Sequence, residues 1–200
     1  MKNIAFLVLA AGKSSRMNSI KQLEKINGET LLDIALEKVN SLFPENVFCV
    51  LGANADEIKQ EITSKNIQFI NNPNFENGLS TSIVSGINYL NENKLNIDGV
   101  FILLADQPAI EISYLESMLH LFQKNSDTII ASNYGNKLGV PVIFPKKYFA
   151  DLLLIIGDKG AKEFIHKRRN EIICPKLTTN FFDIDNKEDL QVFKKSFLNT

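Results

Sequence analysis

The sequence has few of the residues that build disulfide frameworks or zinc sites, with only two cysteines and two histidines among 200 residues. Cys49 lies within an apolar segment and Cys174 stands directly before a proline, so the cysteines are not clustered at metal-ligand spacing. Isolated cysteines of this kind favour a reducing compartment. We therefore expect a cytoplasmic protein that has neither a disulfide framework nor a structural zinc site.

The sequence also lacks long apolar runs and an excess of one charge. No apolar run approaches the roughly 20 residues that a membrane helix needs. The apolar run 4–11 is followed by a basic stretch, which is the wrong order for an export signal. The formal net charge is −1, so no overall field attracts nucleic acid or an anionic membrane. We expect neither as a partner, and any phosphate binding has to come from local basic clusters.

Strand-like and helix-like segments alternate along the chain, and no Pro/Gly/Ser-rich linker, repeat or low-complexity tract interrupts them. The expected strands cover residues 4–9, 47–51, 67–70, 100–104, 128–131, 140–144 and 181–184. The expected helices cover residues 30–43, 55–64, 79–90, 112–123, 146–154, 159–167 and 187–197. This alternation predicts one domain over residues 1–200, an α/β fold in which helices flank an open, mostly parallel sheet. Such sheets bind ligands at the carboxyl ends of their strands.

The loop after the first expected strand reads LAAGKSSRM at residues 9–17. Its small residues let the backbone approach a ligand, and successive N–H groups can form an anion nest. Lys13, Arg16 and Lys21 add three positive charges, a combination that suits a triphosphate. The loop is not a Walker A motif, because Leu7 stands at the first glycine position, and no G-x-G-x-x-G occurs. The alternative is a solvated loop with incidental basic residues.

Two acidic residues are candidate metal ligands. Asp106 follows the expected central strand 100–104, where a carboxylate faces the ligand crevice. Paired with a second carboxylate, it can hold Mg²⁺, which prefers oxygen ligands. Asp185 is the favoured partner and Asp183 the second choice. The alternatives are a turn role for Asp106 and helix capping by Asp185 or Asn186.

The segment NGLSTS at residues 77–82 begins an expected helix. Helix starts rich in Gly and Ser offer free N–H groups to a ligand. The alternative is plain capping of the helix by Ser80 or Asn77.

These segments together resemble a known family. The loop at 9–17 resembles the signature of the nucleotidyltransferase superfamily, and more narrowly that of the molybdenum cofactor cytidylyltransferases, which are MobA-like NTP transferases. Four further segments match in the same order: NGLSTS at 77–82, LLADQP at 103–108, GDKGA at 157–161 and DIDNKEDL at 183–190. The resemblance spans nearly the whole chain and implies a Rossmann-like nucleotidyltransferase fold.

The resemblance implies a Mg²⁺-dependent transfer of a nucleoside monophosphate to a phosphorylated acceptor. Ala10-Ala11-Gly12 favours CTP, because guanylyl members usually carry Ala-Gly-Gly there. The implied acceptor is molybdopterin, and the implied client is a molybdoenzyme. The expected catalytic residues are Lys13, Arg16, Lys21 and Asp106, and the expected metal ligands are Asp106 and Asp185. The expected nucleotide-binding residues are Leu9, Ala10, Ala11, Gly12, Lys13, Ser14, Arg16, Lys21, Asn77, Gly78, Ser80, Ser82 and Asp106.

The expected acceptor site lies around residues 138–144 and 157–160. Family members often carry His before the Pro of the first of these segments, whereas this chain has Gly139-Val140-Pro141.

Three other functions fit the same motifs. They are a sugar-phosphate nucleotidyltransferase of the same superfamily, a GT-A glycosyltransferase that uses Asp183-x-Asp185 as its metal motif, and a non-catalytic chaperone that binds a nucleotide or cofactor.

Overall fold

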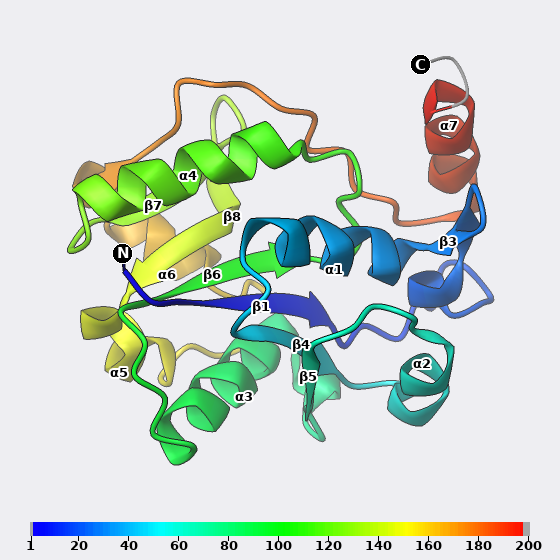
Figure 1. Ribbon diagram of the computed structural model, residues 1–200, viewed down its shortest axis with the longest axis horizontal. Coiled ribbons are helices and arrows are strands. Elements are labelled where there is room, and N and C mark those ends of the chain that lie inside the picture. Colours follow the sequence, from blue (N-terminus) through cyan, green and yellow to red (C-terminus); the bar gives the residue numbers. More distant parts are fainter. Residues whose placement is uncertain (1, 198–200) are drawn as a thin grey trace.

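A seven-stranded sheet forms the middle layer of the computed structural model, which describes residues 2–197 (Figure 1). The strand order is β5-β4-β1-β6-β8-β7-β9. Strands β5, β4, β1 and β6 are parallel, β8 is antiparallel to β6 and β7, and β9 is parallel to β7. The strands are β1 Ile4–Ala10, β4 Val47–Leu51, β5 Ile67–Asn71, β6 Gly99–Leu104, β7 Ile129–Asn133, β8 Leu138–Pro145 and β9 Ile172–Ile173. The predicted fold class is confirmed.

Helices cover both faces of the sheet. The α-helices are α1 Leu31–Leu42, α2 Ala55–Glu61, α3 Leu79–Glu92, α4 Ile112–Lys124, α5 Phe149–Leu152, α6 Lys162–Lys167 and α7 Lys187–Phe197. Helices α1 and α4 pack on one face, and α3, α5 and α6 pack on the other (Figure 1). Short 3-10 helices include η1 Lys21–Leu23, η2 Phe75–Asn77, η3 Lys146–Tyr148 and η4 Arg169–Glu171.

Strand β1 supplies the centre of both cores, because alternate side chains of a strand point to opposite faces. Phe6 and Val8 pack with α1 and α4, whereas Leu7 and Leu9 pack with α3. All four side chains are buried. Burial of an apolar side chain of this size stabilises a fold by about 1.5–3 kcal/mol. The continuous apolar sequence of β1 therefore places it in the middle of the sheet, with helices on both sides.

Helix α3 approaches the sheet closely at Gly86. A Cβ atom at this position would lie 2.4 Å from Cδ2 and 2.6 Å from Cδ1 of Leu7. Leu7 is fully buried in β1. The missing side chain of Gly86 is therefore what lets the helix pass over the central strand.

The start of α1 is tied to the loop after α2 by a buried carboxylate. Asp33 Oδ2 accepts a hydrogen bond from Thr30 Oγ1 at 2.8 Å. Its Oδ1 accepts bonds from Ser64 Oγ at 2.7 Å, Ser64 N at 2.9 Å and Thr63 N at 3.0 Å. Burial by itself raises the pKa of Asp33, but these hydrogen bonds to the charged form outweigh it, and the net pKa is lowered.

A third, smaller core joins α7 to the first loop and to α1. Its buried members are Met17, Ile26, Leu31, Ile34, Ile184, Leu190 and Phe193. Helix α7 therefore lies beside the loop that follows β1 (Figure 1). This packing brings the end of the described chain close to the carboxyl end of β1.

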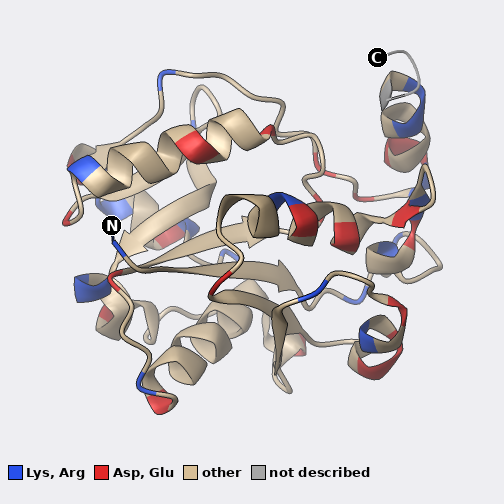
Figure 2. Ribbon diagram, in the orientation of Figure 1, with Lys and Arg blue, Asp and Glu red and all other residues tan. Residues whose placement is uncertain are grey.

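The strand order reverses between β1 and β6. The chain runs from β1 outward through β4 to β5 and then returns to β6 on the other side of β1. Open α/β sheets bind ligands at such a switch point, beyond the carboxyl ends of the strands. In Figure 2, β1 and β6 are free of charged residues, whereas charged residues colour the segments near their carboxyl ends. The topology thus points to the loops after β1 and β6.

Several expected elements differ in the structure. The strand expected at 181–184 is wrong, because this segment runs past the end of β6 without a neighbouring strand and is held there by one backbone bond, Ile184 N to Asp106 O at 2.9 Å. Helix α2 ends at Glu61 rather than residue 64. The helix expected at 146–154 is a 3-10 turn followed by the short α5, and α6 begins at residue 162 rather than 159.

The sequence analysis missed β9 and a two-stranded hairpin. The hairpin consists of β2 Lys25–Ile26 and β3 Glu29–Thr30. It turns at Asn27-Gly28, where both residues have positive φ. Asn-Gly between short strands is a strong hairpin signal.

The apolar length of the helices and the state of the two cysteines are two further properties of the described chain. Within residues 2–197, no helix has both the length and the apolar character to cross a bilayer. Cys49 is buried in β4, Cys174 is half-buried, and both are free thiols.

Candidate active site

The loop after β1 is held from inside by a buried glutamine. Gln22, in η1, donates from Nε2 to the carbonyl oxygens of Ala10 at 2.7 Å and Gly12 at 3.1 Å. Ser14 has a φ of 55° and accepts a hydrogen bond at Oγ from Lys21 N at 3.1 Å. The loop is therefore a folded structure and not a solvated tether. Sequence reasoning missed Gln22, because an amide that bonds two carbonyls carries no motif.

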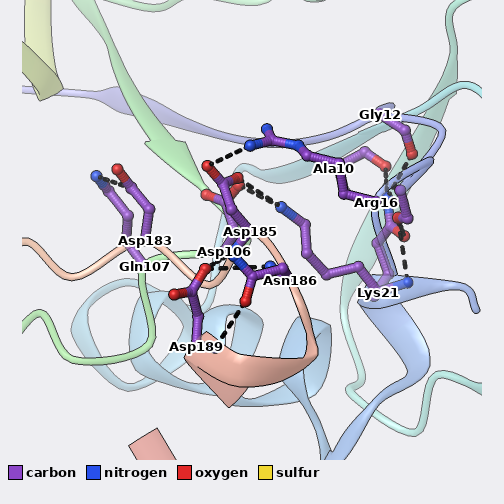
Figure 3. Close-up of polar contacts among 12 residues, drawn as sticks. Ala10, Gly12, Arg16, Lys21, Asp106, Gln107, Asp183, Asp185, Asn186 and Asp189 are labelled. Carbon is purple, nitrogen blue, oxygen red and sulfur yellow. Dashed lines mark hydrogen bonds and ion pairs between the residues drawn. The ribbon is translucent and has the colours of Figure 1, made fainter. Parts of the chain in front are cut away.

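Lys21 joins two carboxylates where β1 and β6 end (Figure 3). Its Nζ lies 2.7 Å from Asp106 Oδ2 and 3.7 Å from Asp185 Oδ1. Arg16 reaches the other oxygen of Asp185, with Nη1 3.3 Å from Oδ2. Two of the three expected basic residues thus meet the two expected metal ligands, which come from distant parts of the chain. The side chains of Lys21 and Asp106 are only 17% and 24% exposed, so their attraction is weakly screened.

The carboxylate of Asp185 faces the site because its neighbours cap α7. Asn186 Oδ1 accepts from Asp189 N at 2.8 Å, and Asp189 Oδ2 accepts from Asp185 N at 3.0 Å and Asn186 N at 3.1 Å. This reciprocal pattern satisfies the N-terminal donors of the helix. Of the two caps considered from the sequence, Asn186 takes the role, which leaves the Asp185 side chain to Lys21 and Arg16 (Figure 3).

The donor set at this point fits a hard divalent cation. Asp106 Oδ1 is buried and has no hydrogen-bond partner among the described residues. Asp106 and Asp185 both lie within ion-pair distance of one ammonium group. No cluster of three or more His, Cys, Asp or Glu side chains that could hold a metal occurs in the described part of the chain. Two carboxylates suit Mg²⁺, which keeps several water ligands and also binds substrate phosphates.

Lys13 points away from these carboxylates. Its Nζ forms an ion pair with Glu76 Oε1 and lies 5.7 Å from the centre of the Phe75 ring. The side chain is 55% exposed. Lys13 therefore sits at the mouth of the site beside η2, apart from Arg16 and Lys21.

A cavity of about 330 Å³ opens beside Lys21. Residues from the first loop, the start of α3 and the end of β6 line it: Leu9, Ala10, Ala11, Gly12, Lys21, Gln22, Leu31, Phe75, Gly78, Leu79, Ser82, Leu104, Ala105, Asp106 and Asp158. Gly78 has a φ of 102°, and a Cβ there would lie 2.5 Å from Gly157 C and 2.6 Å from Asp158 Oδ1. The cavity wall therefore requires glycine at this position.

Other residues expected at the nucleotide lie away from this cavity. Ser80 is fully buried, and its Oγ has no hydrogen-bond partner within residues 2–197. Its backbone N donates to Gly157 O at 3.2 Å. Asn77 is exposed in η2. Ser82, by contrast, lines the cavity and accepts at Oγ from Asn72 Nδ2 at 3.0 Å.

A second cavity of about 480 Å³ adjoins the first and shares four lining residues with it: Leu9, Leu79, Leu104 and Asp158. Its other lining residues are Ile83, Gln107, Tyr134, Lys137, Leu138, Gly139, Val140, Lys159, Ala161, Lys162, Ile165 and Asp183. These include the segments around 138–144 and 157–160 in which an acceptor site was expected. Asp158 stands at the border between the two cavities.

Gln107, another residue that the sequence analysis missed, holds Asp183 at the second cavity. Its Nε2 donates to Asp183 Oδ1 at 2.8 Å and to Tyr134 Oη at 3.0 Å. Burial raises the pKa of Asp183, and the negative charges of Asp106 and Asp185 raise it further, against the opposing hydrogen bond from Gln107. Burial likewise raises the pKa of Tyr134 to about 12. Asp183 is thus occupied by Gln107 and faces the second cavity, while Asp185 faces Lys21.

Comparison with known proteins gives a family match over most of the chain. The model of the MobA-like NTP transferase domain matches residues 6–172. The bifunctional protein GlmU of Francisella tularensis subsp. novicida is 28% identical over 171 residues, which cover 84% of this chain and 36% of GlmU. The chain thus spans little more than a third of the length of that curated relative.

Two solved structures cover nearly the whole chain. The Mycobacterium sp. strain JC1 homologue of M. tuberculosis Rv0371c is 26% identical, with a TM-score of 0.82 over 98% of this chain and 97% of the other. Rv0371c of M. tuberculosis H37Rv in complex with manganese is 21% identical, with a TM-score of 0.74 over 98% of this chain and 100% of the other. The second likeness is one of fold.

Proposed function

This chain belongs to the family of MobA-like NTP transferase domains, and from that premise we propose that it transfers a nucleoside monophosphate from a nucleoside triphosphate to a phosphorylated small molecule. One observation carries the proposal. Asp106 and Asp185, from distant parts of the chain, converge on the Lys21 ammonium at the switch point of the sheet. A site with both basic groups and carboxylate ligands suits a metal-bound triphosphate.

The cavity beside Lys21 is the proposed seat of the nucleotide. The backbone of residues 9–12 offers N–H groups and close approach. Arg16 and Lys13 contact the β- and γ-phosphates, and Lys21 contacts the α-phosphate. Lys13 has to leave Glu76 for this, and because both side chains are more than half exposed, breaking that pair costs little.

The reaction is an in-line displacement at the α-phosphorus. An oxygen of the acceptor phosphate forms a bond to that phosphorus, while the bond to the bridging oxygen of the β-phosphate breaks. The electron pair of the broken bond leaves with pyrophosphate. Because the nucleophile is already an anion, no Ser/His/Asp relay is required. Lys21 and Arg16 lower the barrier by positioning the phosphates and neutralising their oxygens.

Asp106 and Asp185 would hold the Mg²⁺ ion. The unpartnered Asp106 Oδ1 supports this, as does the manganese complex of the related Rv0371c fold. Asp183 is less suited, because Gln107 occupies one of its oxygens. A bound Mg²⁺ supplies charge neutralisation on the phosphoryl oxygens.

We propose CTP as the donor and molybdopterin as the acceptor, which would make a molybdoenzyme the client. The Ala10-Ala11-Gly12 sequence of the first loop supports CTP through the family resemblance. The second cavity lies next to the first, where an acceptor phosphate can meet the α-phosphorus.

A thermal-shift panel of CTP, GTP, UTP and ATP with Mg²⁺ tests the donor. A ligand at about 100 times its Kd stabilises the native state by about 2.7 kcal/mol, which raises the Tm by about 5–10 °C for a chain of this size. We expect the largest shift with CTP. Pyrophosphate release is then measured with molybdopterin and, separately, with sugar phosphates as acceptors.

Asp106→Asn is the informative variant, and Asp127→Asn, an exposed residue that lines none of the cavities described above, is its matched control. We expect Asp106→Asn to lower turnover by about 10²–10³-fold, since it removes an electrostatic contribution of a few kcal/mol. Turnover of Asp106→Asn equal to that of Asp127→Asn would refute the metal assignment.

Release of a nucleoside diphosphate instead of pyrophosphate would favour a glycosyltransferase, and nucleotide binding without turnover on any acceptor would favour a chaperone.

A further inference from the structure

A third hollow, of about 480 Å³, lies on the outer side of the second cavity, and we call it the basic groove. It is lined by Asn136, Lys137, Leu138, Lys159, Lys162, Glu163, Ile165, His166 and Arg169. These residues come from the turn between β7 and β8, from the loop before α6, from α6 and from η4. Leu138 and Lys159 belong to the expected acceptor segments 138–144 and 157–160, and the other seven lining residues lie outside every expected site segment.

The basic groove continues the second cavity. The two hollows share five lining residues: Lys137, Leu138, Lys159, Lys162 and Ile165. They therefore meet along a common wall. A ligand whose reacting end lies in the second cavity can extend along this wall into the groove.

The basic side chains of the groove come from three segments. Lys162 and His166 are four residues apart on α6 and lie on the same side of that helix. Arg169 belongs to η4, and Lys137 lies in the turn before β8. Lys137, Lys162 and Arg169 form no ion pair with a described carboxylate. These three cations are available to an anion.

The single carboxylate of the groove is already paired. Glu163 Oε1 lies 2.7 Å from Lys159 Nζ, one turn earlier in the chain. Its charge is therefore offset within the groove wall. The remaining charge of the groove is positive.

Charge is distributed unequally along the combined hollow. Its inner end carries Asp158 and Asp183 in the second cavity, with Asp106 and its partner Lys21 beyond them in the first. The wall shared with the groove carries Lys137, Lys159 and Lys162, and the groove beyond that wall carries Arg169. An anion without a metal is repelled from the inner end and attracted to the outer one. A molecule with two anionic groups is therefore oriented by the protein.

We propose that the basic groove binds a second anionic group of the acceptor, a phosphate or carboxylate distant from the phosphate that attacks the nucleotide. The inference rests on the proposed transfer to an acceptor phosphate, but it departs from molybdopterin as the acceptor, because molybdopterin has one phosphate and no carboxylate. The substrate class it names is an elongated small molecule with an anion at each end. Lys162 and Arg169 act as specificity-determining residues for its outer end.

The test compares alkane bisphosphates of increasing chain length with alkyl monophosphates of matched length, by calorimetry with Mg²⁺ and without nucleotide. We expect the best bisphosphate to bind about tenfold more tightly than its monophosphate at low salt, because two exposed cations contribute about three- to fivefold each. The advantage should shrink with added salt, since exposed charges are screened.

Variants assign the effect to the groove. Arg169→Gln should remove about three- to fivefold of the advantage and leave the binding of the monophosphate unchanged, because Arg169 lines the groove and not the second cavity. Lys162→Gln alters the wall that the groove shares with the second cavity, so it should weaken the binding of the bisphosphate more than that of the monophosphate. Glu163→Gln should strengthen the binding of the bisphosphate, because it removes the only carboxylate of the groove. Lys65→Gln, at an exposed lysine outside the groove, should change nothing. All four side chains are exposed, so folding should be preserved, which circular dichroism checks.

Equal affinity of the two ligand series, no measurable binding of the bisphosphates, or an advantage that survives Lys162→Gln and Arg169→Gln overturns the proposal. Binding of a poly-glutamate peptide without a preference for bisphosphates also overturns it and assigns the groove to an acidic protein segment. These outcomes are independent of the rise in Tm that a nucleotide is expected to cause. If that rise is absent while the preference for bisphosphates persists, the transfer reaction fails and the anion site stands.

Discussion

Lys21 lies where a divalent cation shared by Asp106 and Asp185 would bind. Its ammonium, 2.7 Å from one carboxylate and 3.7 Å from the other, offsets both negative charges in the absence of a metal. Two cations at this distance from the same oxygens repel each other strongly in a poorly solvated site. Metal binding therefore has to move the ammonium away from the two carboxylates.

Lys21→Met should therefore have opposite effects on two measurements. Without nucleotide, the affinity for Mn²⁺ should rise by about tenfold, because loss of one competing charge is worth about 1.4 kcal/mol. Turnover should fall by about 10²–10³-fold, because the same ammonium stabilises the transition state. Electron paramagnetic resonance of free Mn²⁺ gives the affinity. Lys25→Met, at an exposed lysine of β2, is the control, and an unchanged or weaker affinity in Lys21→Met contradicts the competition.

The Asp33 carboxylate makes the free energy of unfolding depend on pH in the acid range. Its pKa in the folded protein is lowered below 3.8, so the stabilisation is present above about pH 4 and is lost as the pH falls through the folded value. At neutral pH, Asp33→Asn should lower the free energy of unfolding by about 1–3 kcal/mol, because it weakens hydrogen bonds to a charged acceptor. Urea unfolding at several pH values should show the difference from wild type narrowing below pH 4. A difference that is constant with pH, or equal to that of exposed Asp127→Asn, argues against this role.

Site residues could be predicted from the sequence where a charged residue follows the end of an expected strand. Arg16, Lys21, Asp106 and Asp185 do meet in space, as those patterns suggested. The direction of Lys13 could not be predicted, since its partners Glu76 and Phe75 come from a loop whose position depends on the tertiary fold. Buried amides such as Gln22 were missed for a related reason, because their role depends on which carbonyls the fold brings to them.

At the scale of elements, the passage of α3 over β1 depends on one missing side chain. Gly86 lies in the middle of a helix, where glycine costs about 1 kcal/mol relative to alanine. Its contact with buried Leu7 explains why the position tolerates that cost. The spacing of the helix from the sheet also sets the position of Gly78 and Ser82 at the cavity.

Gly86→Ala should destabilise the protein despite its better helix propensity. A Cβ 2.4 Å from Leu7 Cδ2 overpacks the core, and overpacking costs about 1–3 kcal/mol. Thermal unfolding should show a lower Tm, whereas Asn88→Ala, on the exposed side of the same helix, should keep or raise it. In a Leu7→Ala background the cost of Gly86→Ala should shrink, since the clash is relieved. Equal costs in both backgrounds would show that the contact is not responsible.

Helices and strands with a regular spacing of apolar residues could be predicted from the sequence, whereas elements held by tertiary contacts could not. The bounds of β4 and α7 agree with the expected ranges, because apolar runs and helical spacing are local signals. The segment 181–184 is apolar apart from Asp183, but it passes the end of β6, which β1 and β8 already pair on both sides, so it remains an extended strap. The β2–β3 hairpin could have been predicted from Asn27-Gly28, because this dipeptide favours a tight hairpin turn.

At the scale of the whole molecule, the strap and α7 close the site from outside. Ile184 is fully buried among residues of α1, α7 and the first loop, and its N–H bonds Asp106 O. From this fixed backbone, the neighbours of Ile184 point to different places: Asp183 lines the second cavity, and Asp185 contacts Lys21 and Arg16. Packing of the third core therefore helps to determine the separation of Asp106 and Asp185, the two proposed metal ligands.

Ile184→Ala should weaken both the fold and the site. Truncation of a buried Ile costs about 2–5 kcal/mol of stability. Release of the strap should also raise the KM for the metal–nucleotide complex, because Asp185 is less well positioned. Urea unfolding and steady-state kinetics measure the two effects. Val192→Ala, on the exposed side of α7, should leave both unchanged, and a stability loss in Ile184→Ala with an unaltered KM would separate the third core from the site.

The distance along the chain between Asp106 and Asp185 has a consequence for biosynthesis. Translation proceeds from the amino terminus, and domains begin to fold as they emerge. A nascent chain that has formed the sheet can already pair Lys21 with Asp106, but its second carboxylate is still inside the ribosome. If Asp106 and Asp185 hold the ion as proposed, both ligands come together only after the strap has docked, and chains that end before Asp185 should be inactive whatever their content of secondary structure.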